Sequence, residues 1–261
     1  MLRPPPRPRL ALALACGLLA AATAAAESDL LLDLPESFGT VDAATFDVNR
    51  KRVGDAHLVM ERIDGGNVQL ISQSGFTGGA HTVITAIFEP AARSGKLRPL
   101  RQESRSFDHA GNPLGRLLID HAEGAARCFD PQGVQSAELE IPADDRVANT
   151  ALSLLFLPLV RNELQEIEFQ LFFCGLGTRF VPFTANRVAT NGKRPNAIEV
   201  RYGPDFGFAT MVASSFVPRL SFWFDPATPH RWLAHRLPLY GKGPEVFVVR
   251  KGVPPRWLGD D

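Results

Sequence analysis

Apolar and polar residues alternate with a period of two over much of this chain. The clearest case is QEIEFQLFFC (Gln165–Cys174), in which the odd positions from Ile167 to Phe173 are apolar and Glu166, Glu168 and Gln170 are polar. Successive side chains of a strand point to opposite faces of its sheet. The segment therefore predicts a strand in a sheet that has one face in water and the other against an apolar core.

Other segments have the composition and the turn residues of strands. His57–Ile63 and Val68–Phe76 flank a Gly-rich turn and predict a β-hairpin. Thr82–Pro90 is rich in β-branched residues, and Leu97–Asp108 ends at a cluster of turn residues. We expect roughly ten to twelve strands in all, without a fixed-period repeat or a strong domain boundary.

One segment departs from this period. Asp144–Asn162 opens with residues that favour a helix N-terminus, and Pro158 is expected to end the helix. Its apolar run, Thr150–Val160, is too short to span a bilayer, although a helix that touches a membrane remains an alternative. The predicted fold is mainly β: a strongly curved antiparallel sheet, or half-barrel, with one helix packed against it.

The N-terminus has the three parts of a secretory signal peptide. Three arginines precede an apolar run from Leu10 to about Ala22, which leads into the small residues Ala24–Ala26. We expect export to the periplasm and cleavage near Ala26, with a membrane anchor as the alternative. An outer-membrane lipoprotein is less favoured, because the apolar run continues past Cys16.

These features divide the chain into four parts. Residues 1–26 are the signal peptide, 27–45 a lead-in segment, 46–252 a single β-rich half-barrel domain and 253–261 a C-terminal tail. The chain after cleavage has 25 basic and 28 acidic residues, so it lacks the basic field of a nucleic-acid-binding protein. We expect no stable transmembrane segment after cleavage.

Two cysteines remain after the leader, Cys128 and Cys174. In an oxidising compartment they can form a disulfide, which would stabilise by roughly 4 kcal/mol in the chain-entropy model. Two separate buried thiols are the equal alternative, because sequence alone does not bring the two positions together.

Motifs of known chemistry are absent from the sequence. It contains no Gly-x-Ser-x-Gly, His-Glu-x-x-His or Cys-x-x-Cys. His230 and His235 are five residues apart. At this spacing the two side chains could not bind the same metal ion, whether the segment is a strand or a helix. We therefore predict no catalytic residue, no metal and no cofactor.

The aromatic stretch Ser221–Pro244 is better explained as a hairpin than as a site. Leu220, Phe222 and Phe224 alternate to one face, and Asp225–Pro229 forms the turn. Trp232 is expected to lie beside Trp223 across the hairpin, with His230 and His235 on opposite faces. The apolar face of the sheet then forms either a filled core or a pocket. Five residues carry the pocket hypothesis: Phe169, Leu171, Phe173, Phe222 and Phe224.

The order of several motifs resembles a group of uncharacterised exported bacterial proteins, a domain of unknown function. The motifs are HLVMERI preceded by Gly54-Asp55, LRPLRQESRSFD, the Arg-Cys-Phe-Asp-Pro run at Arg127–Pro131, the Asp-led helix segment and LSFWFD. The resemblance spans roughly Phe46 to Gly252 and rests on order and spacing. It implies the half-barrel of the lipoprotein carriers LolA and LolB, and it makes an apolar ligand an expectation.

The function that we expect is a non-enzymatic periplasmic binding module for a lipid, an acyl chain or an envelope protein segment. Two alternatives remain from the sequence. One is a structural or assembly factor of the cell envelope, and the other is a hydrolase whose site the motifs do not reveal.

Overall fold

The computed structural model describes residues 30–35, 37–92, 94–144, 146–175, 177–188, 197–205, 220–240 and 243–253. Within these ranges the protein forms one antiparallel sheet of 14 strands with few helical residues, which confirms the predicted fold class. The strands of the first half are β1 (Gly39–Phe46), β2 (Arg52–Arg62), β3 (Val68–Gly75), β4 (His81–Pro90), β5 (Leu97–Phe107), β6 (Pro113–Asp120), β7 (Ala125–Phe129) and β8 (Gln135–Glu140). Those of the second half are β9 (Glu166–Phe173), β10 (Arg179–Val188), β11 (Ile198–Pro204), β12 (Leu220–Phe224), β13 (Trp232–Pro238) and β14 (Glu245–Arg250).

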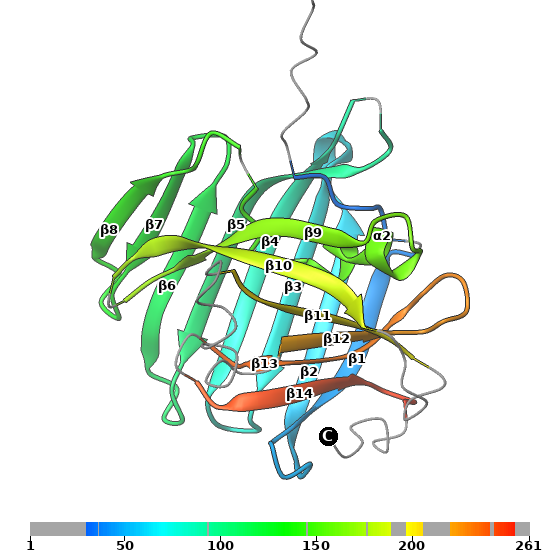
Figure 1. The fold of residues 1–261 in the computed structure, drawn as a ribbon. Coiled ribbons are helices and arrows are strands. Elements are labelled where there is room, and N and C mark those ends of the chain that lie inside the picture. The colour runs from blue at the N-terminus through cyan, green and yellow to red at the C-terminus, as the bar shows by residue number, and fades with distance from the viewer. Residues whose placement is uncertain are drawn as a thin grey trace, which may run out of the picture.

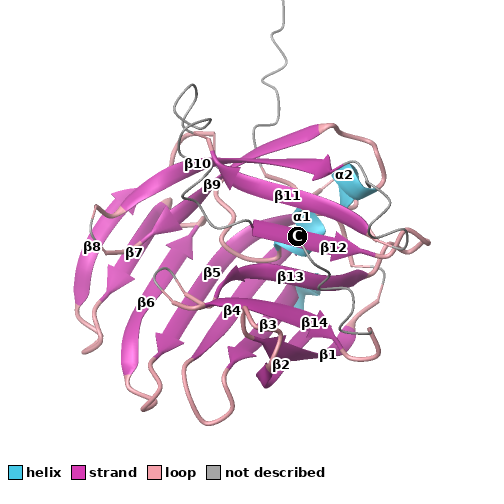
Figure 2. Cartoon of the chain, turned by 60° about the horizontal axis from the view of Figure 1, so that its bottom comes forward, coloured by secondary structure: helices cyan, strands magenta, loops and turns pink. Residues whose placement is uncertain are grey.

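The strands follow one another in space in a simple order. Their order in the sheet is β8-β7-β6-β5-β4-β3-β2-β1-β14-β13-β12-β11-β10-β9. Each half is a meander of neighbouring strands, and the pairing of β1 with β14 joins the two halves. The sheet curves so strongly that the second half crosses in front of the first (Figures 1 and 2). It does not close, because β8 and β9 remain its two edges.

Local turn chemistry explains the first hairpins. The hairpin predicted for His57–Ile63 and Val68–Phe76 is confirmed: β2 and β3 pair in register, and a short 3-10 turn, η1 (Asp64–Gly66), connects them. Gly65 and Gly66 have φ of 75° and 80° there, a region that glycine enters without steric cost. The two glycines therefore allow the chain to reverse tightly between β2 and β3.

The helical segment differs from the prediction of a single helix. It contains two short helices, α1 (Leu152–Leu155) and α2 (Leu157–Val160), and before them Val147 forms an isolated bridge with Gln170. Ala151 has a φ of 55°, which breaks any continuous helix that starts at Asp144. Pro158 lies at the start of α2 rather than at the end of a helix, where its missing N–H costs nothing.

A buried glutamine fixes the chain that leads into α1. Gln102 on β5 is 1% exposed, and its Oε1 accepts hydrogen bonds from the backbone N–H groups of Asn149 (2.9 Å) and Thr150 (3.0 Å). Its Nε2 donates to the carbonyl of Val147 at 3.1 Å. One side chain thus satisfies backbone groups that would otherwise be buried without partners.

The same segment covers the edge strand β9. Gln170 exchanges backbone hydrogen bonds with it: its N–H donates to the carbonyl of Arg146 (2.7 Å), and its carbonyl accepts from Ala148 (3.0 Å). The side chain of Asn149 continues the pattern, since it accepts from the N–H of Phe172 (2.8 Å) and donates to its carbonyl (2.7 Å). Part of an otherwise open sheet edge is thereby paired.

Cys128 and Cys174, whose pairing the sequence left open, form a disulfide. Cys128 lies on β7, one strand from the β8 edge, and Cys174 follows the edge strand β9. The bond therefore links the two ends of the unclosed sheet. Beside Cys128, the buried side chains of Ile119, Val147 and Phe172 form a small apolar cluster across the same gap.

The N-terminal boundary also differs from the prediction. The residues assigned to a lead-in segment contain most of β1, and Leu32 already pairs with Leu97 through hydrogen bonds of 2.9 and 2.8 Å. The domain therefore begins before Phe46. The predicted signal peptide and most of the C-terminal tail lie outside the described residues.

Candidate functional site

A cavity of about 550 Å³ lies between the two halves of the sheet. Strands β1–β4 form one wall, and β12–β14 form the opposite wall. The residues before α1, and α1 itself, form a third side. The cavity is a product of the sheet's curvature, because no single hairpin supplies more than part of one wall.

One row of side chains shows how the first wall is built. Val41, Leu58, Ser72 and Ile84 are cross-strand neighbours on β1 to β4. All four line the cavity, and each is only half-buried although it points away from the wet face. Leu58 and Ile84 pack against the main core on one side, and all four residues border the cavity.

The opposite wall and the third side are mainly apolar. Phe222 and Phe224 come from β12, Leu237 from β13 and Val248 from β14, and Leu152 comes from α1. Such a lining suits an apolar ligand, because each buried CH₂ group contributes roughly 0.8 kcal/mol. The cavity volume also lies within the range of roughly 300–1,000 Å³ that is common for small-molecule sites.

The polar residues of β3 and β4 in the first wall are small. Ser72 and Ser74 occupy inward positions on β3, where a larger side chain would fill the space. Thr82 is buried and donates from Oγ1 to the carbonyl of Leu239 at 2.8 Å, so its hydroxyl is already satisfied. Small residues at inward positions are the sequence signal that could have located this wall.

His235 introduces a polar ring into the apolar wall. Its ring lies 5.1 Å from that of Phe222 and 5.4 Å from that of Trp232. Burial lowers its pKa from the usual 6.5 to about 3, since desolvation penalises the charged form. The imidazole is therefore neutral at ordinary pH.

The cavity lining also contains two arginines, Arg231 and Arg250. Arg231 is exposed and precedes β13, whereas Arg250 ends β14 and is half-buried. Arg250 is paired across the sheet with Ala43, an inward-facing residue, so it lies on the cavity face of its strand. Burial and the nearby charge of Arg231 both lower the pKa of Arg250, although a guanidinium stays charged.

The interior of the sheet is filled on one side and open on the other. Phe156, between α1 and α2, is fully buried and contacts the rings of Phe169, Tyr202 and Phe222 at centroid distances of 5.9, 5.4 and 5.4 Å. The helical segment therefore packs against the β9–β11 part of the sheet as core. The space under β1–β4 and β12–β14 is left open.

This division separates the five residues of the pocket hypothesis. Phe222 and Phe224 line the cavity. Phe169 belongs to the filled core at 1% exposure, and Leu171 and Phe173 pack against that core without lining the cavity. The sequence pattern identified the inward face correctly, but it did not show where α1 and α2 fill it.

The hairpin predicted for the aromatic stretch is confirmed as β12 and β13, but two details were wrong. A bulge shifts the register so that Trp232 pairs with Phe224 and faces inward, whereas Trp223 packs on the outer side against Phe247. His230 lies in the turn before β13 rather than on the strand, and it lines the cavity as His235 does.

The side chains of Asp225 and His230 on this hairpin do not form a catalytic pair. The Asp225 carboxylate accepts from the N–H of Ala227 at 2.9 Å. The Nδ1 of His230 lies 3.1 Å from the backbone carbonyl of Asp225, so it does not meet the carboxylate. Among the described residues, no group of three or more His, Cys, Asp or Glu side chains could hold a metal ion.

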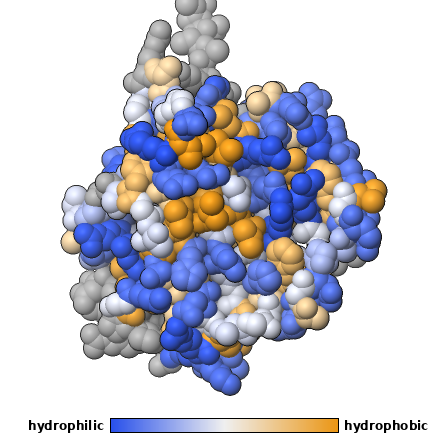
Figure 3. Space-filling view, turned by 180° about the vertical axis from the view of Figure 1, so that it is seen from behind, coloured by the Kyte–Doolittle hydropathy of each residue, from blue (hydrophilic) through white to orange (hydrophobic). Residues whose placement is uncertain are grey.

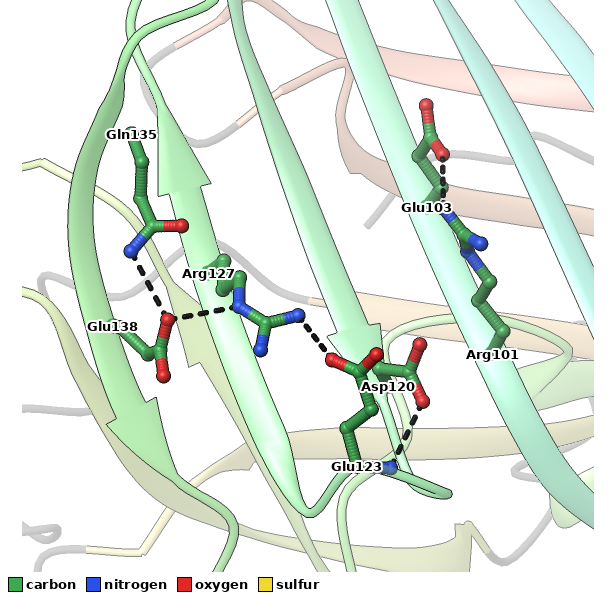
Figure 4. Close-up of polar contacts among 7 residues, drawn as sticks. All are labelled: Arg101, Glu103, Asp120, Glu123, Arg127, Gln135 and Glu138. Carbon is green, nitrogen blue, oxygen red and sulfur yellow. Dashed lines mark hydrogen bonds and ion pairs between the residues drawn. The ribbon is translucent and has the colours of Figure 1, made fainter.

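The outer face of β5–β8 holds an ion-pair network instead of a site. Arg127 binds Glu123 at 2.6 Å and Glu138 at 2.8 Å, and Gln135 donates to the same Glu138 carboxylate (Figure 4). These hydrogen bonds lower the pKa of Glu138 and raise that of Arg127. The carboxylates are largely exposed, which indicates a solvated sheet face.

The outer face behind the cavity is mostly polar, with apolar side chains gathered near its middle (Figure 3). Ile71 on β3 is 37% exposed and is the cross-strand neighbour of Val59 on β2. None of the helices in the described parts of the chain is long and apolar enough to cross a membrane.

Comparison with known proteins shows a likeness to solved structures and no match to a family model or a curated protein. Among solved structures this chain is similar to a β-barrel-like protein of domain of unknown function DUF1849 from Brucella abortus. That likeness has a TM-score of 0.40 and 10% sequence identity, and it covers 81% of this chain and 94% of the other.

Proposed function

We propose that this protein is an exported, non-enzymatic binding module that holds an apolar ligand, such as a lipid or an acyl chain, in the cavity between the halves of its sheet. The observation that carries the proposal is the cavity of about 550 Å³ with a mainly apolar lining. Apolar walls that face a hollow forgo packing contacts, and a ligand would restore them. The leader-like N-terminus and the disulfide support a periplasmic location.

The test blocks the cavity and leaves the outer face as a control. Ser72→Phe places a ring into the row formed with Leu58 and Ile84. Gln73→Phe makes the same change at the next residue of β3, which is exposed on the outer face. Protein from the periplasm is examined by native mass spectrometry for a bound lipid and titrated with the neutral apolar dye N-phenyl-1-naphthylamine.

We expect the wild type and Gln73→Phe to carry bound lipid and to bind the dye. Ser72→Phe should lose most of both kinds of binding. Overpacking can destabilise a protein by roughly 1–3 kcal/mol, so circular dichroism must show that Ser72→Phe is folded. Wild-type protein that carries no lipid and binds no dye would refute the proposal. A mature N-terminus near Glu27 is expected in the same mass spectra.

A further inference from the structure

The charges that line the cavity are of one sign. Its lining contains Arg231 and Arg250 but no Asp or Glu side chain among the described residues. The other ionisable lining groups are histidines. His235 is neutral, and His57 is bound to Asp42 at 2.8 Å.

The two arginines also lack the partners that other arginines have. Most arginines of the described chain pair with a carboxylate, as Arg127 does with Glu138 and Arg236 does with Glu245 at 2.7 Å. Within the described ranges, no ion pair joins Arg231 or Arg250 to an acidic side chain. A half-buried guanidinium without a counter-charge is unfavourable, and an anion at this place would relieve that cost.

Their position relative to the apolar walls decides the ligand class. Arg231, Ser37 and Gly39 are exposed lining residues, whereas Leu70 and Thr82 are buried lining residues. We take the exposed lining residues as the mouth of the cavity. A ligand with an apolar chain inside would place its head group near Arg231 and Arg250. Guanidinium groups bind carboxylates and phosphates through paired hydrogen bonds.

On this basis, and resting on the proposed function, we infer that the cavity selects amphiphiles with an anionic head group, held by Arg231 and Arg250 at its mouth. The shared chemistry is a carboxylate or a phosphate monoester on one end of an apolar chain. A neutral or cationic head on the same chain forfeits the paired hydrogen bonds.

The experiment compares four ligands with the same ten-carbon chain: decanoate, decyl phosphate, 1-decanol and decyltrimethylammonium. For each ligand, the concentration that displaces N-phenyl-1-naphthylamine is measured on the wild type, on Arg231→Gln/Arg250→Gln and on Lys251→Gln. Lys251 is the matched control, because it follows Arg250 directly but its Nζ lies 3.6 Å from Asp42 and it does not line the cavity.

Decanoate and decyl phosphate should displace the dye from the wild type at concentrations roughly tenfold or more below those of the other two ligands. The double variant should lose this preference and still bind the dye and 1-decanol as the wild type does, which also shows that it is folded. Lys251→Gln should keep the preference. The order of decanoate and decyl phosphate then tells whether the head is a carboxylate or a phosphate.

Two results would overturn the inference: equal displacement of the dye by all four ligands, or an unchanged preference for anions in the double variant. If that variant does not fold, the ligand series on the wild type still decides for or against an anionic preference, and the single variants locate it. Absence of dye and ligand binding in the wild type would refute the proposed function itself, which separates the two failures.

Discussion

His235 shows how a polar side chain changes when it lines an apolar cavity. It packs near the rings of Phe222 and Trp232, and its pKa falls to about 3 because burial removes the water that would stabilise its charged form. Arg250 lines the same cavity, but a guanidinium loses its proton only at very high pH. One nitrogen base is therefore a neutral group in the wall, and the other is a permanent charge.

This difference predicts a dependence of stability on acid. In the unfolded chain His235 takes up a proton near pH 6.5, whereas in the folded protein it resists protonation down to about pH 3. Unfolding thus binds a proton between these values, so its free energy should fall by up to about 1.4 kcal/mol for each pH unit below 6.5. Above that pH the group should have no effect.

Urea unfolding of the wild type and of His235→Gln at pH 7, 6 and 5 measures this contribution. The variant should lose less stability between pH 7 and 5 than the wild type loses. His109→Gln, a change at an exposed histidine, should keep the wild-type slope. Parallel pH profiles for the wild type and His235→Gln would contradict the prediction.

At the scale of elements, the edge strand β9 depends on a segment that is neither strand nor helix. Arg146 and Ala148 exchange backbone hydrogen bonds with Gln170, and the Asn149 side chain occupies the place of a backbone partner for Phe172. The amide of asparagine carries a donor and an acceptor, as a peptide group does. A side chain can therefore extend a ladder where the backbone turns away towards α1.

Asn149→Ala should remove both hydrogen bonds to Phe172 and expose this part of the β9 edge. We expect the free energy of unfolding to fall by roughly 1–3 kcal/mol, because a buried N–H loses its acceptor. The exchange of the Phe172 amide hydrogen should also become faster, relative to amides of β3. Asn186→Ala, at an exposed site on β10, should leave both quantities unchanged. Normal protection of Phe172 in Asn149→Ala would show that the pairing is not needed.

The strands were predictable from sequence because their signal is local. Alternation identified β9 and β12, and the Asp-Gly-Gly turn identified the β2–β3 hairpin. The helix was not predictable in detail, since Asp144 and the apolar run favour a continuous helix by propensity alone. Tertiary contacts override that propensity. Gln102 binds the backbone N–H groups of Asn149 and Thr150, and the next residue, Ala151, has a positive φ.

At the scale of the whole molecule, the cavity results from contacts between residues far apart in sequence. The pairing of β1 with β14 brings Ala43 beside Arg250. The sequence of neither strand shows that the other is its partner. For this reason the sequence showed an apolar face but could not divide it into core and cavity. Along β14 the inward positions are Val246, Val248 and Arg250. A charged residue at an inward position was a feature of the sequence that could have indicated a cavity at this place.

The disulfide acts at the same scale, because it spans the gap that hydrogen bonds leave open. Cys128 and Cys174 are 46 residues apart in sequence, and a bond across such a loop contributes about 4 kcal/mol in the chain-entropy model. Cys128→Ala/Cys174→Ala should lower the free energy of unfolding by a few kcal/mol, measured in urea without reductant. Dithiothreitol should destabilise the wild type to a similar degree and leave the double variant unaffected. The cavity walls β1–β4 and β12–β14 contain neither cysteine, so dye binding by the folded variant should stay at the wild-type level. A double variant as stable as the oxidised wild type would mean that Ile119, Val147 and Phe172 hold the gap by packing alone.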